Sequence, residues 1–327
     1  MRALVCHSLS DDFRGVSVAE IDAPQPGPGE MAVRVRAASV NFPDLLMCQG
    51  LYQFKPEPPF TPGMDIAGDV VDLGAGVSGF AIGDEVTAGV RLGGFAEIAL
   101  VSAAAAKPKP AAFDWAKASA YQAAYLTAYV ALHRRAHVQR GETVLVHGAA
   151  GGVGLACVDL ARRAGATVIA TASTPEKRKF LAGYGADHVL DATGFRDHVK
   201  AMTGGRGADV IYDPVGGDVF DESVRCIAFD GRLLVIGFTS GRIPTISANM
   251  PLIKGFSVVG VRAGEYGRQF PERGRENLDA IWALADAGEI RPHICAELPL
   301  SRALEGFAML RERRAFGKVV LRPDVER

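Results

Sequence analysis

The sequence has no long hydrophobic run, almost no net charge and no paired cysteines. No stretch approaches the roughly 18 apolar residues of a membrane-spanning helix, and no apolar run typical of a secretory leader follows Met1. Its 36 basic and 37 acidic residues leave a net charge of −1, which is too small to attract nucleic acid or anionic lipid. We therefore expect a cytoplasmic protein that binds neither membranes nor nucleic acid.

The five cysteines are odd in number and widely spaced, and none forms a Cys-x-x-Cys pair. This pattern is typical of reduced, buried thiols and argues against a disulfide framework or a cysteine-rich zinc lobe. They are Cys6, Cys48, Cys157, Cys226 and Cys295. The remaining composition, with 48 % hydrophobic and 22 % charged residues over 327 positions, is that of a globular protein of about two domains.

The first third of the chain predicts a β-rich domain. Glycine and proline separate short alternating runs such as Met31–Val35 and Phe95–Val101, which is the pattern of antiparallel strands joined by turns. Helical periodicity begins near Asp114 and continues without a break to Arg135, where cations suit the end of a helix.

From Glu142 onward, apolar strand-like runs alternate with helical stretches, as in VLVHG, ATVIATAS and LLVIG. This alternation predicts a parallel sheet built from βαβ units. After Val261 the chain becomes helical again and closes with GKVVLRP, a returning strand. We therefore expect an α/β fold, in which a doubly wound domain of residues 126–261 is inserted into a β-rich domain of residues 1–125 and 262–327.

The segment VLVHGAAGGVGLACVDLARRAGATVIATAS carries the sharpest functional pattern. Ala149, Gly151 and Gly154 occupy the spacing G-x-G-x-x-G between a strand and a helix, and a second strand follows, as a dinucleotide site requires. Gly151 would let the backbone approach a pyrophosphate, Gly154 would let the helix pack closely, and the helix N-terminus would attract phosphate. The predicted cofactor-binding residues of this loop are Ala149, Ala150, Gly151, Gly152, Val153 and Gly154. A purely structural glycine-rich turn is the alternative.

The end of the second strand favours NADPH over NADH. NAD sites carry Asp or Glu there, but this strand ends Ala172-Ser173, and the first carboxylate is Glu176. Ser173 and Lys177 could bind a 2′-phosphate, which a carboxylate would repel. We predict that they do so, although the run Lys177–Lys179 could instead be a solvated helix face.

Taken together, these segments resemble the medium-chain dehydrogenase/reductase superfamily, and specifically its zinc-free quinone oxidoreductase branch. The matching segments cover nearly the whole chain and include VNFPDLLMCQGLY, PPFTPGMDIAGDVVDLGAGV, GDEV, GGFAE, VLVHGAAGGVG, GADHVLD, YDPVGG and LLVIGF. The resemblance implies a GroES-like β domain, a six-stranded Rossmann domain and hydride transfer in a cleft between them.

The resemblance also implies a site without a metal ion. In zinc alcohol dehydrogenases, a cysteine in a segment like G-V-C-H-T-D and a histidine in G-H-E hold the catalytic zinc, but here those positions are Asn41 and Met64. A catalytic zinc needs three protein ligands, so two losses remove the site. Without zinc to stabilise an alkoxide, the easier substrates are quinones, enones and enoyl thioesters, whose charge is delocalised as hydride arrives.

Related quinone reductases share the pattern N-x-x-D followed by G-x-Y, which here gives Asn41, Asp44 and Tyr52 as candidate catalytic residues. We expect Asn41 to fix a ribose or substrate oxygen and Tyr52 to hydrogen-bond or stack in the pocket. Asn-x-x-Asp is also a common helix N-cap pattern, and Tyr52 could be a core aromatic. The resemblance places Thr127 near the nicotinamide amide and Lys318 within reach of the cofactor, although Lys318 could lie at the surface.

One departure from the family weakens the NADPH prediction. Several quinone reductases have a tyrosine in an Asn-Tyr pair after the third strand of the Rossmann domain, where it covers the adenosine phosphate. This chain has Asp191-Ala192 at that place, so the contact is missing.

The leading expectation is an NADPH-dependent reductase of quinones or related conjugated carbonyls. One alternative is an enoyl thioester reductase, for which Arg262 and Arg268 are the only hints of coenzyme A phosphate binding. Another is a cofactor-binding protein without enzymatic activity. The run Gly255–Gly260 predicts a last strand at a sheet edge, and an unpaired edge favours a homodimer.

Overall fold

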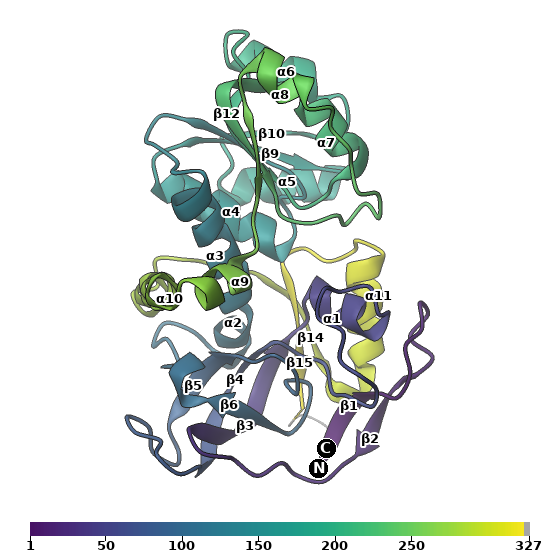
Figure 1. The fold of residues 1–327 in the computed structure, drawn as a ribbon, viewed down its shortest axis with the longest axis vertical. Coiled ribbons are helices and arrows are strands. Elements are labelled where there is room, and N and C mark those ends of the chain that lie inside the picture. Colours follow the sequence, from purple (N-terminus) through teal and green to yellow (C-terminus); the bar gives the residue numbers. More distant parts are fainter. Residues whose placement is uncertain (324–327) are drawn as a thin grey trace. The chain divides into compact units, whose positions relative to one another are not determined.

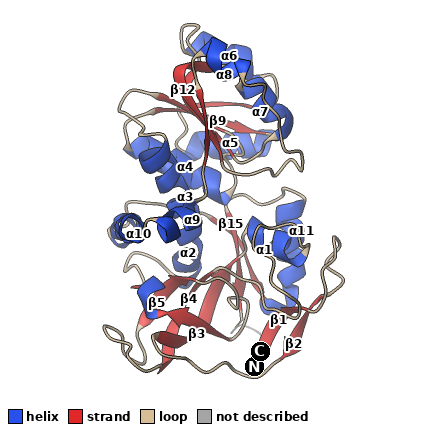
Figure 2. Cartoon of the chain, in the orientation of Figure 1, coloured by secondary structure: helices blue, strands red, loops and turns tan. Residues whose placement is uncertain are grey.

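The computed structural model describes residues 1–323, which form two compact units (Figure 1). The first unit is Met1–Ala123 together with the chain from Trp282 onward, and the second is Ala124–Ile281. One unit is β-rich and the other contains a parallel sheet whose strands alternate with helices (Figure 2). The expected α/β fold class is therefore confirmed.

The first unit is built on a seven-stranded sheet with the order β14-β15-β3-β4-β5-β7, in which β6 also pairs with β3. Its strands are β3 (Glu30–Ser39), β4 (Asp65–Leu73), β5 (Glu85–Gly89), β6 (Ile98–Ser102), β7 (Ala106–Pro108), β14 (Ile294–Pro299) and β15 (Lys318–Arg322). All neighbours are antiparallel except β14 and β15. A separate antiparallel pair consists of β1 (Arg2–Cys6) and β2 (Val16–Glu20).

Short helices complete the first unit. They are α1 (Phe42–Cys48), α2 (Trp115–Ala120) and α11 (Ala303–Arg311), with 3₁₀ turns at Ala103–Ala105 and Leu300–Arg302. Phe307 of α11 packs its ring against Phe13 at 5.3 Å and against Phe95 at 6.2 Å between ring centroids. All three rings are buried with the sheet residues, so this aromatic group joins α11 to the sheet as one hydrophobic core.

The second unit holds a six-stranded, wholly parallel sheet with the order β10-β9-β8-β11-β12-β13. Its strands are β8 (Thr143–Val146), β9 (Thr167–Ala172), β10 (His188–Asp191), β11 (Ala208–Asp213), β12 (Ile227–Val235) and β13 (Ser257–Gly260). The strand order reverses between β8 and β11, and ligands of such sheets bind at the carboxyl ends of the strands beside this point.

The helices of the second unit connect these strands and follow them. They are α3 (Gln122–Tyr129), a π-helical turn (Val130–Arg135), α4 (Gly152–Arg163), α5 (Pro175–Tyr184), α6 (Phe195–Met202), α7 (Gly217–Ser223), α8 (Asn249–Lys254), α9 (Ala263–Gln269) and α10 (Pro271–Asp286), of which α3 begins and α10 ends in the first unit.

The single long helix expected from Asp114 to Arg135 is instead broken between α2 and α3 at Tyr121. The Thr87 hydroxyl of β5 donates a hydrogen bond of 2.7 Å to the Ala118 carbonyl. In an unbroken helix, that carbonyl would accept the Gln122 N–H. A long-range contact therefore competes with the helical bond, and the periodicity of the sequence does not reveal it.

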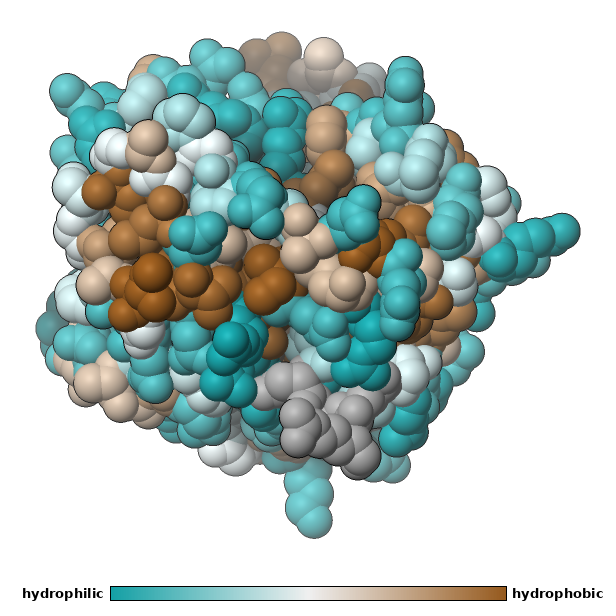
Figure 3. Space-filling view, turned by 90° about the horizontal axis from the view of Figure 1, so that it is seen from below, coloured by the Kyte–Doolittle hydropathy of each residue, from teal (hydrophilic) through white to brown (hydrophobic). Residues whose placement is uncertain are grey.

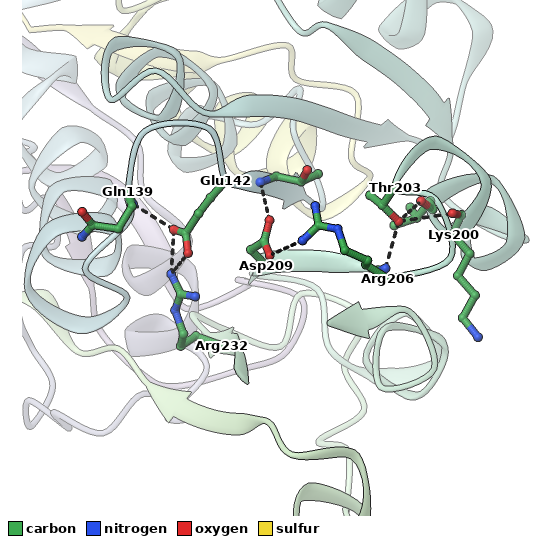
Figure 4. Close-up of polar contacts among 10 residues, drawn as sticks. Gln139, Glu142, Lys200, Thr203, Arg206, Asp209 and Arg232 are labelled. Carbon is green, nitrogen blue, oxygen red and sulfur yellow. Dashed lines mark hydrogen bonds and ion pairs between the residues drawn. The ribbon is translucent and has the colours of Figure 1, made fainter. Parts of the chain in front are cut away.

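A polar network braces the amino-terminal edge of the parallel sheet (Figure 4). Arg232 of β12 donates two hydrogen bonds, of 2.9 and 2.8 Å, to the carboxylate of Glu142, which also accepts the Gln139 N–H at 2.8 Å. Asp209 of β11 accepts the Thr143 N–H of β8 at 2.7 Å. These bonds satisfy backbone donors at one edge of the sheet, whereas a nucleotide would bind at the opposite edge.

Among residues 1–323, no helix is both long enough and apolar enough to cross a membrane. On the face drawn in Figure 3, apolar residues gather in patches between polar ones, as they do on most globular proteins.

Candidate functional site

The loop after β8 and the start of α4 present half-buried backbone donors, at Gly152 and Val153, at the carboxyl edge of the parallel sheet. Helix α4 begins at Gly152, and its N-cap residue, Gly151, has no side chain that could cap the first turn. The N–H groups of that turn are therefore available to an anion, and the helix dipole favours negative charge there. The Ala149 N–H donates to the Thr171 carbonyl at 3.2 Å, which ties the loop to the end of β9.

Gly154 is required for the close approach of α4 to this loop. A Cβ atom added to Gly154 would lie 2.5 Å from the Gly148 oxygen and 2.7 Å from the Ala149 Cα, both of which are backbone atoms. Gly148 itself has a φ of +55°, a left-handed conformation that favours glycine. A larger residue at position 154 would therefore push the helix start away from the loop.

A fully buried histidine, which the sequence analysis did not identify, supports the same edge. His147 Nδ1 lies 2.9 Å from the Thr171 hydroxyl of β9, and Nε2 lies 2.8 Å from the Ser223 hydroxyl of α7. Because Ser223 donates its own proton to the Val219 carbonyl, it accepts from an Nε2–H tautomer. Burial lowers the pKa of His147 to about 3, so the ring is a neutral bridge between β8, β9 and α7.

The predicted phosphate-binding residues follow β9. Ser173 is exposed directly after the strand, and Thr174 caps α5 by accepting the Lys177 N–H at 3.3 Å. Lys177 is only 9 % exposed, so most of its side chain is buried rather than solvated. Thr127 lies in α3 of the second unit and is half-buried.

A buried cluster in the first unit joins three of its elements. The Lys318 ammonium of β15 donates to Asn41 Oδ1 at 2.6 Å, just before α1. The Asn41 Nδ2 donates to Asp65 of β4 at 2.9 Å and to the Ser39 carbonyl at 3.3 Å. Lys318 and Asp65 are buried, whereas Asn41 is half-buried. Asn41 is thus the most accessible of these three residues.

Asp44 braces the start of α1 from inside the same cluster. Its two carboxylate oxygens accept the N–H of Asn41 at 2.8 Å and the N–H of Gly63 at 3.1 Å. Asp44 therefore has the helix-capping role that the Asn-x-x-Asp pattern suggests, and its side chain is also fully buried.

Burial controls the charges of this cluster. Burial raises the pKa of Asp44 to about 7, and the nearby charge of Asp65 adds to this rise, while the backbone N–H bonds and Lys318 oppose it. Burial also raises the pKa of Asp65 and lowers that of Lys318, and the attraction between these two groups opposes both shifts. If both carboxyls were ionised, the single ammonium would leave one negative charge unbalanced in a buried site. The cluster therefore favours keeping a proton on one of the two carboxyls.

The structure brings together some of the sequence-predicted residues but not all of them. In the first unit Asn41, Asp44 and Lys318 lie in one cluster. Tyr52, in contrast, packs as a half-buried ring against the hydrophobic core. The sequence analysis missed Asp65, although it follows Met64 directly in a segment that had been examined for metal ligands.

No group of three or more His, Cys, Asp or Glu side chains within residues 1–323 is arranged to hold a metal ion. Asn41, which stands where zinc alcohol dehydrogenases have a metal-binding cysteine, uses its side-chain amide to bond Lys318 and Asp65. Met64, which stands where they have a metal-binding histidine, packs against the core of the first unit.

Two family models match the chain. Residues 27–111 match the alcohol dehydrogenase GroES-like domain, and residues 152–281 match the zinc-binding dehydrogenase family. A quinone oxidoreductase-like protein 2 homolog from Nematostella vectensis is 38 % identical over 325 residues, which are 98 % of this chain and 88 % of that protein.

Solved structures are similar over nearly the whole chain. Escherichia coli quinone oxidoreductase complexed with NADPH has a TM-score of 0.91 at 27 % identity, and the match covers 99 % of this chain and 100 % of the other. The CurK enoyl reductase has a TM-score of 0.90 at 25 % identity, with 98 % and 99 % covered.

Proposed function

Because the chain belongs to the quinone oxidoreductase-like group of the medium-chain dehydrogenase/reductase superfamily, we propose that it is an NADPH-dependent reductase of quinones or related conjugated carbonyls that works without a metal ion. The observation that carries this proposal is the bonding of Asn41. At a position where zinc alcohol dehydrogenases have a metal-binding cysteine, this amide bridges a buried ammonium and a buried carboxyl. Residues 126–261 contain the strands of the nucleotide-binding sheet.

The residues of the second unit fit NADPH. The uncapped start of α4 offers N–H groups for a pyrophosphate, and the contact at Gly154 keeps that helix start close to the loop. The side chain of Ser173 is exposed at the end of β9, and Lys177 follows in the next turn. NADPH, when bound, supplies the hydride, while Ala149–Gly154, Ser173, Lys177 and Thr127 hold and orient it.

The cluster of the first unit would stabilise charge on the substrate. The Lys318 ammonium polarises the Asn41 amide through Oδ1, which strengthens Nδ2 as a donor. The bond from Nδ2 to the Ser39 carbonyl is long, at 3.3 Å, so a substrate oxygen that gains negative charge can replace it. Asp65 accepts from this amide and Asp44 holds the backbone N–H of Asn41, while Tyr52 would border the substrate as an aromatic wall.

This chemistry favours substrates that delocalise the incoming negative charge. A zinc ion would stabilise a localised alkoxide, but Asn41 and Met64 offer no thiolate or imidazole to hold one. An amide donor stabilises charge less strongly, and this suffices for a quinone or an enone, in which the charge spreads over a conjugated system.

Reduction of an enoyl thioester is the second candidate, which the likeness to the CurK enoyl reductase supports. The two arginines that suggested coenzyme A binding weaken it. Glu265 forms ion pairs with Arg262 at 3.8 Å and with Arg268 at 2.9 Å, so part of their positive charge is already neutralised. A quinone or enone is therefore the preferred substrate class.

The proposal is tested by NADPH oxidation with a short panel of quinones, enones and enoyl thioesters. We expect turnover with quinones or enones that persists after chelation, and an Asn41→Ala variant with a kcat lower by about 10²-fold, the usual cost of one oxyanion donor. Gln49→Ala, which removes an amide near the end of the same helix where it bonds the Asp11 carbonyl, is the control. One tightly bound zinc per chain, with activity lost on its removal, would refute the metal-free mechanism.

We also propose a cytoplasmic homodimer that forms through the β13 edge of the parallel sheet. Within residues 1–323, β13 pairs with β12 alone, so its outer side has no partner strand there. Beside it, Phe229 is 82 % exposed and Leu252 is 81 % exposed, and the Phe229 ring lies over Gly255. An apolar, unpaired edge suits a second copy of the same edge, because two-fold symmetry makes such a surface self-complementary.

A further inference from the structure

Two neighbouring strands end side by side where the adenosine ribose of a dinucleotide would lie. β9 and β10 are parallel, and their register pairs Asp191 with Ala172, the last residues of the two strands. Ser173 follows Ala172 directly. In Rossmann folds, the residues at the end of the second strand contact the 2′ position of the ribose. Asp191 is therefore adjacent to the position that distinguishes NADPH from NADH.

Arg178 reaches this position from the second turn of α5. Its Nη1 donates to the Ala172 carbonyl at 3.1 Å and to Asp191 Oδ2 at 2.6 Å. The other oxygen of Asp191 accepts the N–H and the hydroxyl of Thr193, both at 3.2 Å. Thr193 and Arg178 thus bond opposite oxygens of the Asp191 carboxylate. Through its bond to Nη1, Asp191 keeps the Arg178 guanidinium at the end of β9.

The opposite edge of the guanidinium has no partner among residues 1–323. Both of its bonds within residues 1–323 use Nη1, so the Nε–H and the two Nη2–H donors remain. This is the planar fork that binds a phosphate through two parallel hydrogen bonds. The Arg178 side chain is 28 % exposed, so a ligand can reach it although its position is constrained.

We propose that Arg178 recognises the 2′-phosphate of NADPH and that Asp191 is a positioning residue that holds its guanidinium at the end of β9. This inference rests on the proposed use of NADPH and names a residue that decides it. Asp191 contacts only Nη1 and so leaves the phosphate-binding edge unused. Its negative charge is 49 % exposed and therefore well screened, which makes its orienting effect larger than its repulsion of the phosphate.

Binding of small nucleotides tests the role of Arg178 without any substrate. Calorimetry compares 2′,5′-ADP, which carries the 2′-phosphate, with 5′-AMP, which lacks it. We expect Arg178→Gln to weaken 2′,5′-ADP binding by about 10-fold or more, the usual loss for a charge-assisted contact, and to change 5′-AMP binding by less than 2-fold. Lys179→Gln removes the same charge from an exposed position on the same helix and should change neither.

An unchanged preference for 2′,5′-ADP in Arg178→Gln, or an equal loss in Lys179→Gln, would overturn the assignment of Arg178. The first result would mean that other residues bind the 2′-phosphate. The second would mean that the phosphate is attracted by the overall positive charge of α5 and not by a specific contact with Arg178. Thermal unfolding of each variant shows whether it is folded. If Arg178→Gln is unfolded, Arg178→Lys replaces it, and it should bind 2′,5′-ADP more weakly because a point charge lacks the fork.

The positioning role of Asp191 is tested by comparing its removal with its replacement by another carboxylate. Asp191→Ala should weaken 2′,5′-ADP binding about 3-fold through the lost orientation of Arg178, leave 5′-AMP binding unchanged, and be partly restored in Asp191→Glu. Tighter 2′,5′-ADP binding in Asp191→Ala would show competition instead of positioning and would refute this role. A protein that binds 2′,5′-ADP through Arg178 but reduces no quinone, enone or enoyl thioester would refute the proposed function alone.

Discussion

At the scale of single residues, Asp44 has the clearest dependence on pH. It is fully buried, and its two oxygens accept N–H bonds that hold the start of α1. Burial raises its pKa to about 7, with a further contribution from the charge of Asp65. Around neutral pH this carboxyl therefore exchanges a proton inside the fold, next to the residue that we propose contacts substrate.

We predict that Asp44 lowers the stability of the protein as pH rises. An unfolded Asp titrates near 3.9, so between about pH 4 and 7 the folded state binds the additional proton. The contribution to stability is fully present below the unfolded pKa and is lost as pH rises through the folded pKa. Asp44→Asn cannot ionise, so between pH 5 and pH 8 its free energy of unfolding should fall less than that of the parent, by about 1 kcal/mol or more.

Urea unfolding at the two pH values measures this difference. Asp197→Asn is the control, because the hydrogen bond from Arg196 holds the pKa of Asp197 below its ordinary value and so below this pH range. Parallel pH dependence of the Asp44→Asn variant and the parent protein would contradict the prediction.

Long sequence separations explain which site residues could be predicted. Asn41 and Asp44 lie in one short motif, and the sequence indicates them together. Lys318 is predicted through the resemblance, but its contact with Asn41, 277 residues away, depends on the position of the returning strand β15. Asp65 is not predicted, because its contact with Asn41 depends on the pairing of β3 with β4.

At the scale of elements, the start of α4 depends on the absence of a side chain at position 154. We predict that Gly154→Val weakens NADPH binding by at least 10-fold and lowers stability, because Cβ alone would lie 2.5 Å from the Gly148 oxygen. Gly183→Ala in α5 is the matched control, since its Cβ meets nothing within 4 Å, and it should gain about 0.5–1 kcal/mol of stability. Fluorescence titration of NADPH and urea unfolding measure the two effects. Unaltered nucleotide binding in Gly154→Val would contradict the assigned loop.

The amino-terminal edge of the same sheet should affect stability without affecting the nucleotide. Arg232→Met leaves the Glu142 carboxylate without its two guanidinium bonds, and both side chains are 20 % exposed. We predict a loss of about 1–3 kcal/mol in the free energy of unfolding, with the Kd for NADPH unchanged. Arg206→Met removes a more exposed ion pair of 3.4 Å with Asp209 and should cost less than about 0.5 kcal/mol. Equal losses in the two variants would show that burial of the Glu142 pair contributes nothing.

Elements of the parallel sheet are more predictable than the helices before it. Buried Val, Ile and Leu runs between glycine turns mark β8, β9 and β12 because each such strand is covered on both faces. The break between α2 and α3 cannot be predicted in this way, since it depends on the Thr87 hydroxyl, which the sequence places more than thirty residues away.

At the scale of the whole molecule, the net charge of −1 leaves little electrostatic repulsion between copies. The apolar residues that flank the β13 edge are then free to drive association. The insertion of one domain into the other is visible in the sequence, because the β-rich pattern stops before Glu142 and a strand returns at Lys318. The partner of an edge strand is not visible in the sequence in this way, since a self-complementary surface depends on the symmetry of the assembly.

The mass of the protein in solution tests the β13 edge as a dimer interface. Light scattering should give about twice the 34.5 kDa mass of one chain, and Leu252→Asp should shift the protein toward the monomer, because a buried carboxylate without a partner costs several kcal/mol. Ile82→Asp provides the control: Ile82 is 66 % exposed in the first unit, and its substitution should leave the dimer intact. A monomeric parent protein at micromolar concentrations, or an Ile82→Asp variant that dissociates as readily as Leu252→Asp, would exclude the β13 edge as the dimer interface.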